Sequence, residues 1–301
     1  MAGPVCGARS TATNGRSSRV DGGLSAGAGR DAALPSTVQM RRRLVGPRLL
    51  LLVALACALL AVSVSAQPFL GFGAWGRPNL RYDGEVTFVR LRWDRGEFGA
   101  QVYGRGYMMW AHEFPRAEQH LMTLLNDFTT VDAKDTGSLI LPLDDPQLFR
   151  HPIALMQEPG FWAMTDGQAQ RLREYLLKGG FVIFNDFEDR QWENFEAQMR
   201  RVIPEGRWLP LDPGHRIFDT FFNVEKLDLP NPYNHHLAGL VPEYFGLFED
   251  NDPEGRLMSI ACYNTNLAEF WQSGGTGFFP IEPMNTGFEL GINYWMYGLT
   301  H

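Results

Sequence analysis

Apolar residues beyond position 84 fall into short segments whose periodicity alternates between that of strands and that of helices. Residues 85–93 alternate apolar and polar side chains, which is typical of a half-buried strand. Residues 181–184 form a continuous apolar run, as expected for a parallel strand buried on both faces. Four further apolar runs predict the remaining strands: 138–143, 152–156, 243–248 and 257–263.

Four intervening segments place apolar residues every three or four positions, which predicts helices that bury one face. Thr165 and Gln168 form a capping box at the start of the second helix, and Gly179 ends it because glycine accepts a left-handed backbone. Thr286 with Glu289 predicts the start of the last helix. The predicted buried stripes are Ala117, Leu121, Leu124 and Phe128; Ala169, Leu172 and Leu176; Trp192, Phe195, Met199 and Val202; and Phe288, Ile292, Trp295 and Leu299.

The order of these segments, strand and helix in alternation with short connections, predicts a parallel sheet covered by helices on both faces. We therefore expect one α/β domain over residues 85–301, a three-layer sandwich with a mostly parallel sheet. Residues 67–84 begin with a glycine-rich stretch and are expected to be a linker.

Residues 40–66 contain the three parts of a secretory signal. Arg41-Arg42-Arg43 precedes an apolar run over 49–64, and the small residues Val64 and Ala66 suit cleavage directly after them. The run is shorter than the roughly 20 residues that a membrane helix needs, so we expect a signal peptide, with an uncleaved membrane anchor as the alternative. The protein is then exported across the cytoplasmic membrane, to the periplasm or the exterior, and meets the membrane only through an uncleaved signal.

Residues 1–39 would place this signal unusually far from the amino terminus. They are rich in Gly, Ala, Ser and Arg and show no apolar periodicity, so we expect disorder. The simplest interpretation is that translation begins at Met40 and that the upstream stretch is a mis-called start.

Charge divides the chain at the same place. Residues 1–66 hold eight arginines and two acids, a net +6, and subtraction from the totals of 27 basic and 34 acidic residues leaves 19 and 32 for residues 67–301, a net −13. Such an acidic body argues against a nucleic-acid partner. It also contains one cysteine, Cys262, in a predicted strand, which excludes a disulfide framework and makes a cysteine zinc site untenable.

Motifs for cofactors are weak or missing. Gly71, Gly73 and Gly76 match the dinucleotide pattern G-x-G-x-x-G, but no predicted strand enters the motif and Pro78 follows it, so we interpret it as part of the linker. The sequence has no Walker loop, no G-x-S-x-G elbow and no H-E-x-x-H. We therefore predict no cofactor and assign no metal ligand.

The densest polar cluster, 185–189, directly follows the buried strand 181–184 and includes Asp186 and Glu188. In open α/β sheets the functional crevice lies outside the carboxyl ends of the strands, and Glu158 follows the preceding strand in the same way. Carboxylates gathered there could bind a hard cation or act as a general acid and base. The alternative, which we favour from sequence alone, is that Asp186 or Asp189 caps the following helix.

Other residues give weaker signals. Among the seven histidines, His112, beside Glu113, and His215 are the better candidates for a pocket, whereas His235-His236 is expected in an exposed loop. Four tryptophans fall in predicted loops, where they could stack on sugar rings or a protein partner, or cover the core: Trp75, Trp110, Trp162 and Trp271.

Several segments spread over the body of the chain carry a family resemblance: 143–152, 156–160, 179–181, 186–187, 192–195, 215 with 217–218, 255–258, 264–266 and 291–294. Together they resemble the bacterial domain-of-unknown-function 4159 family, over roughly residues 85–301. The resemblance implies a flavodoxin-like α/β sandwich similar to the class I glutamine amidotransferases and the ThuA-like proteins.

The same resemblance argues against one activity, glutamine hydrolysis by a cysteine nucleophile. Amidotransferases place a nucleophilic cysteine on the turn after the buried strand, where this chain has Asn185-Asp186-Phe187, so thiol-dependent glutamine hydrolysis is not expected. The leading hypothesis is a non-catalytic module that binds a small molecule or an envelope protein. The alternative is a hydrolase of an envelope carbohydrate or related small molecule, with Glu158, Asp186, Glu188 and His215 as candidate residues.

Overall fold

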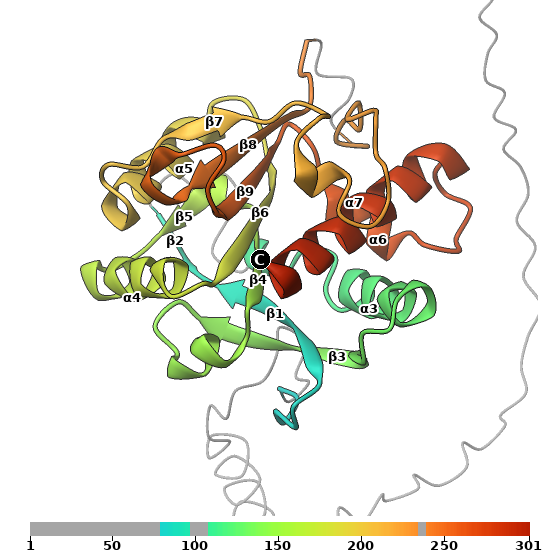
Figure 1. Cartoon of the computed structure of the whole chain (residues 1–301), viewed down its shortest axis with the longest axis horizontal. Helices are drawn as coiled ribbons and strands as arrows, with labels where there is room; N and C mark the ends of the chain where they lie inside the picture. Colours follow the sequence, from blue (N-terminus) through green and yellow to red (C-terminus); the bar gives the residue numbers. More distant parts are fainter. Residues whose placement is uncertain (1–78, 97–107, 234–238) are drawn as a thin grey trace, which may run out of the picture. The chain divides into compact units, whose positions relative to one another are not determined.

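A seven-stranded sheet forms the centre of the computed structural model, which describes residues 79–96, 108–233 and 239–301 (Figure 1). The first five strands in spatial order run parallel, and the last two are added antiparallel. A short antiparallel pair lies outside this sheet. In spatial order the sheet contains β3 (Ala133–Pro142), β1 (Val86–Arg92), β4 (Ile153–Gln157), β6 (Phe181–Phe187), β9 (Leu257–Tyr263), β8 (Glu243–Phe248) and β7 (Trp208–Pro210), and the pair is β2 (Asp94–Arg95) with β5 (Trp162–Ala163).

Helices cover both faces of the sheet (Figure 1). On β6, Val182 and Phe184 pack in the core beneath α4 (Asp166–Leu177) and α5 (Gln191–Val202), whereas Ile183 packs on the other side. The other face is covered by α3 (Arg116–Phe128), α6 (Leu267–Gln272) and α7 (Ile281–Thr300). The expected α/β architecture with a mostly parallel sheet and helices on both faces is therefore confirmed. Five single turns of 3-10 helix complete the elements: Met109–Ala111, Pro146–Arg150, Pro159–Phe161, Arg216–Phe218 and Glu249–Asn251.

The second predicted helix shows how local signals set its ends. The Thr165 hydroxyl accepts a hydrogen bond from the Gln168 N–H, and the Gln168 side chain accepts one from the Thr165 N–H, so the capping box is confirmed. The helix stops before Gly179, whose φ of +104° is accessible to glycine at little cost.

Two helix predictions were partly wrong. The last helix starts at Ile281, and the Thr286 hydroxyl donates to the Glu282 carbonyl within it instead of capping its start. In α3 the buried face is centred on Leu121, Met122 and Leu125, and Phe128 is exposed, so the predicted stripe was displaced by about one position.

The end of the predicted linker is part of the domain. The Asn79 side chain pairs with both the N–H and the C=O of Ile140 on the edge strand β3, which satisfies two backbone groups that an edge strand leaves open. Residues 79–84 therefore do not behave as a free linker. The expected signal (40–66), the upstream stretch (1–39) and the motif at Gly71 lie outside the described residues. Across the described ranges, no helix is both long enough and apolar enough to span a membrane.

Three of the four predicted loop tryptophans are core residues. Trp162 and Trp271 are fully buried, and Trp110 is also buried, so none of these three offers a face for stacking on a sugar. Trp75 lies outside the described residues, as do His235 and His236. Cys262 is buried in β9, as its position in an apolar strand predicts.

Candidate functional site

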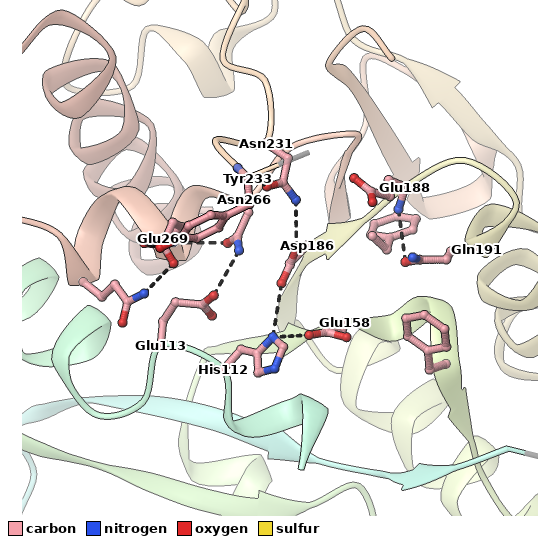
Figure 2. Close-up of a pocket in the computed structure, with 13 residues that line it drawn as sticks. His112, Glu113, Glu158, Asp186, Glu188, Gln191, Asn231, Tyr233, Asn266 and Glu269 are labelled. Atoms are coloured by element: carbon pink, nitrogen blue, oxygen red, sulfur yellow. Dashed lines mark hydrogen bonds and ion pairs between the residues drawn. The ribbon is translucent and has the colours of Figure 1, made fainter. Parts of the chain in front are cut away.

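A cavity of about 400 Å³ opens at the carboxyl ends of the parallel strands. Glu158 follows β4, Asp186 lies near the end of β6, and Asn266 follows β9, while His112 and Glu113 follow the 3-10 turn after β1. The crevice outside the strand ends is where open α/β sheets bind ligands, so the fold itself collects these side chains. Figure 2 shows them converging from separate elements.

Three of these side chains meet at one point. The Nδ1 atom of His112 pairs with the carboxylate of Glu158 and lies 3.7 Å from Oδ2 of Asp186 (Figure 2). One potential ligand atom from each residue lies within 4.8 Å of the other two. We name His112, Glu158 and Asp186 the triad; these are the residues in the described part of the chain that could hold a metal ion together.

The backbone at the site adopts a conformation that L-residues avoid. Glu113, Glu158 and Asp186 have φ values of +60°, +49° and +61°. A left-handed backbone at a residue other than glycine costs on the order of 1 kcal/mol, and such residues cluster where function requires them. Three of the acidic residues with this conformation line one cavity.

A buried ion pair holds the His112 segment in place. Arg90 on β1 and Glu118 on α3 are both fully buried and form an ion pair. The Arg90 guanidinium also donates to the Trp110 and His112 carbonyls, at 3.0 and 2.8 Å. These bonds fix the backbone just before the cavity, so His112 is positioned by the strand and helix beneath it.

Amide side chains orient the carboxylates. Gln157 Nε2 donates to Glu113 Oε2 at 2.7 Å and lies 3.2 Å from Asp186 Oδ2. Asn266 Nδ2 donates to the other Glu113 oxygen at 3.0 Å, and Asn231 Nδ2 lies 3.3 Å from Asp186 Oδ1. The carboxylates of Glu113 and Asp186 are thereby each held by two neutral amide donors.

The site has a large excess of acidic side chains over basic ones. Five carboxylates line the cavity, those of Glu113, Glu158, Asp186, Glu188 and Glu269, against one imidazole, His112. Burial and the neighbouring charge of Asp186 raise the pKa of Glu113 well above its ordinary value. Burial likewise raises the pKa of Glu269, against hydrogen bonds from Tyr233, Gln272 and Ser273.

Within the triad, burial and pairing act in opposite directions on the histidine. Burial lowers the pKa of His112, but its hydrogen bonds to Asp186 and Glu158 outweigh burial and raise the pKa to about 11. Burial raises the pKa of Glu158 to about 7, against the opposing hydrogen bond from His112. In the absence of other ligands, the cluster therefore retains protons at neutral pH.

The prediction that Asp186 or Asp189 caps the next helix was wrong. Helix α5 begins at Gln191 after Arg190, and no side chain caps it. The Asp186 carboxylate instead faces His112, Gln157 and Asn231. Glu158 and Glu188 also line the cavity, so three of the four sequence candidates come together.

His215, the fourth candidate, lies elsewhere. Its Nδ1 accepts a hydrogen bond from the Ile217 N–H at 3.3 Å, and the residue lines a separate cavity of about 440 Å³ beside β7. The expected convergence of His215 with Glu158 and Asp186 was therefore wrong, and His112 occupies that place. The sequence had marked His112 as a pocket candidate without indicating its partners.

Several further cavity residues were not selected from sequence, among them Asn266, Tyr233 and Glu269. Asn266 could have been found, because 264–266 directly follows the predicted strand 257–263 in the way that Asp186 follows its strand. Glu269 lies on the short helix α6, which was not predicted, and the Tyr233 hydroxyl donates to it at 3.0 Å. Nothing in the local pattern around Tyr233 signals its role.

The thiol is remote from this chemistry. Cys262 is fully buried on β9 beside Tyr294, and burial raises the pKa of its thiol to about 12. Asp186, near the carboxyl end of β6, lines the cavity instead. Among the described residues, the side chain at this strand end is therefore a carboxylate and not a thiol.

Fold and site together define an α/β protein with an acidic cavity at the carboxyl ends of a mostly parallel sheet. Residues 97–299 match the family model described as Domain of unknown function (DUF4159), and the chain belongs to this family. Comparison with curated proteins finds no match.

Proposed function

We propose that this protein is an exported hydrolase that acts on an envelope carbohydrate or a related small molecule in the acidic cavity. The observation that supports this most is the convergence of His112, Glu158 and Asp186 from three separate elements in one cavity. Export is proposed from the basic, apolar and small-residue parts of 40–66.

Hydrolysis adds water across a bond: oxygen from water bonds to the electrophilic carbon, the bond to the leaving group breaks, and a proton reaches that group. The triad supplies groups that can hold a water molecule and take up its proton, which is the requirement of such a step. The cavity volume of about 400 Å³ suits a small substrate or one or two sugar units.

The lining favours a polyhydroxylated ligand. Amide and carboxylate side chains, which bond sugar hydroxyls, alternate with the aromatic residues Phe161, Phe187 and Tyr233. Tyr233 is 54% exposed at the cavity, so its ring is accessible to a ligand. This combination supports a carbohydrate over an apolar substrate.

We also propose the finer fold, a flavodoxin-like sandwich related to the class I glutamine amidotransferases. Numbered along the chain, the parallel strands β3-β1-β4-β6-β9 have the order 2-1-3-4-5, which is the flavodoxin-like order. The left-handed Asp186 near the carboxyl end of β6 supports the relation, because the enzymes hold their nucleophile at the end of the corresponding strand.

A second candidate is a non-catalytic module that binds a small molecule or an envelope protein. It is favoured by the residue at this strand end, because this chain has Asp186 where the amidotransferases have their nucleophilic cysteine. Both candidates use the same cavity, and they differ in whether the bound molecule is cleaved.

The test compares turnover by the purified full chain and three variants. Chromogenic glycosides, acylated sugars and fragments of envelope glycan serve as substrates, and binding is followed by thermal shift, because a ligand of the native state raises the melting temperature. Asp186→Asn and Glu158→Gln should lose turnover by more than about 100-fold, in the range of lost acid–base catalysis. Glu193→Gln, which removes an exposed carboxylate on α5, is the matched control and should keep it.

Turnover lost in both cavity variants and retained in the control supports the hydrolase. A ligand that raises the melting temperature of the native chain without being cleaved contradicts it and supports the binding module. Turnover unchanged in Asp186→Asn contradicts any catalytic role of this cavity.

A further inference from the structure

We propose that the triad of His112, Glu158 and Asp186 binds a divalent first-row transition cation, Mn²⁺ or Zn²⁺. Binding itself follows from the geometry and charge of the cavity. The ion's role in hydrolysis rests on the proposed function.

The ligand atoms are already gathered. Nδ1 of His112 pairs with Glu158, and Asp186 Oδ2 lies 3.7 Å from the same nitrogen. Donor atoms about 2.0–2.2 Å from one ion lie roughly 3–3.5 Å from each other. Because all three atoms lie within 4.8 Å, small side-chain rotations suffice to place them around an ion.

Residues behind the ligands fix their orientation, as is usual for metal ligands. Gln157 and Asn231 hold the two oxygens of Asp186, and the Arg90 guanidinium holds the backbone carbonyl of His112. The left-handed backbone of Glu158 and Asp186 directs both side chains into the cavity. The site is therefore built before the ion arrives.

The charge of the whole cavity is an independent reason for a cation. Five carboxylates share about 400 Å³, and His112 is the one basic side chain among the thirteen lining residues. Partly buried carboxylates at this density are costly unless protons or a cation compensate them. Glu113 and Glu269 line the same cavity as the triad.

The ligand types select the class of ion. One imidazole and two carboxylates form a mixed nitrogen and oxygen set, which suits Mn²⁺, Fe²⁺ or Zn²⁺ better than Ca²⁺ or Mg²⁺, whose ligands are oxygens. No thiolate belongs to the triad, so a thiolate-selected ion such as Cu(I) is not favoured. Three protein ligands facing an open cavity leave positions for water and substrate, and in the proposed hydrolysis the ion polarises that water.

Calorimetric titration of the chelator-treated full chain with MnCl₂ and with ZnCl₂ tests the site. The native chain should bind one ion per chain, with weaker binding of Mg²⁺. Asp186→Asn and Glu158→Gln should each weaken binding by at least about 10-fold, the effect expected even of residues that support metal ligands. Glu193→Gln removes an exposed carboxylate and should bind as the native chain does.

Circular dichroism of each variant shows whether it is folded, and the native chain itself keeps the proposal falsifiable. No binding of Mn²⁺ or Zn²⁺ by the folded native chain, or equal loss in Glu193→Gln, overturns the metal site. Turnover that survives chelation, without a bound ion, overturns the ion's role in hydrolysis while leaving the hydrolase intact. Metal binding without turnover of any substrate supports the site and contradicts the hydrolase.

Discussion

Removing one partner of the buried Arg90–Glu118 pair should strongly destabilise the protein. Both side chains have no exposed surface, and Glu118→Gln leaves the guanidinium charged and without its counter-ion. Breaking a buried ion pair in this way costs about 3–5 kcal/mol. For a domain of this size each kcal/mol lowers the melting temperature by about 2–4 °C, so the expected loss is roughly 6–20 °C.

Urea unfolding followed by circular dichroism measures this free energy. The matched control is Glu196→Gln, which removes the carboxylate of an exposed Arg–Glu pair on α5, worth about 0.3–0.5 kcal/mol. Removing both charges with Arg90→Met and Glu118→Leu should recover part of the loss, but not all of it, because the Trp110 and His112 carbonyls then lose their donor. A loss below about 1 kcal/mol in Glu118→Gln would refute the inference that this pair is buried and holds the His112 segment.

Three further predictions concern the scaffold. Thr165→Ala should cost about 1 kcal/mol of unfolding free energy by removing a helix cap, and Thr165→Ser should restore most of it. Cys262 should resist alkylation in the native chain, since burial raises its pKa to about 12; peptide mass spectrometry should show its labelling rise only with unfolding, and rapid native labelling would contradict the burial. Burial lowers the pKa of His151 from its ordinary 6.5, so the folded state disfavours the proton and the contribution of this residue to stability should fall as pH drops below about 6.5. Because the raised pKa of Glu158 acts in the opposite direction, the test compares variants: relative to the native chain, the urea midpoint of His151→Gln should fall less, or rise more, as pH drops, while the similar contribution of His215 is kept.

Most of the scaffold is predictable because its signals are local. The run 181–184 is buried on both faces, and a continuous apolar run of this length in an α/β chain is typical of a central parallel strand. Thr165 and Gln168 lie three residues apart and satisfy each other's backbone groups, so no distant contact is needed to define that helix start. The last helix was misjudged because Thr286 and Glu289 imitate a cap, although the helix already begins at Ile281.

The candidate site was predictable only in part. Ligands of open α/β sheets bind outside the carboxyl ends of the strands, which locates the site at one edge of the sheet but does not show which other side chains reach it. This expectation correctly brought Glu158 and Asp186 to the same cavity. His112 reaches them through a segment after β1 whose backbone is held by Arg90. The buried ion pair between Arg90 and Glu118 on α3 could not be predicted, because the apolar periodicity of the sequence does not indicate it. His215 follows β7 at the far antiparallel edge and so could not join them.

Burial explains the remaining differences. Trp162 and Trp271 were expected in loops, but both side chains are fully enclosed, and Trp271 Nε1 donates to the Gly287 carbonyl on α7. A tryptophan in a short irregular segment cannot be assigned to surface or core until the neighbouring helix is placed. Helix α6, which contains Trp271 and Glu269, spans Leu267–Gln272 and is too short for a periodic signal.

The proposed hydrolysis in the cavity around Asp186 can be followed by mass spectrometry of the products formed when the full chain acts on envelope glycan fragments in water enriched in heavy oxygen. The native chain should yield products that carry one heavy oxygen atom from water, and folded Asp186→Asn should yield none above the background without protein. Unlabelled fragments with the native chain, or equal labelling with Asp186→Asn, would contradict the proposed hydrolysis in this cavity.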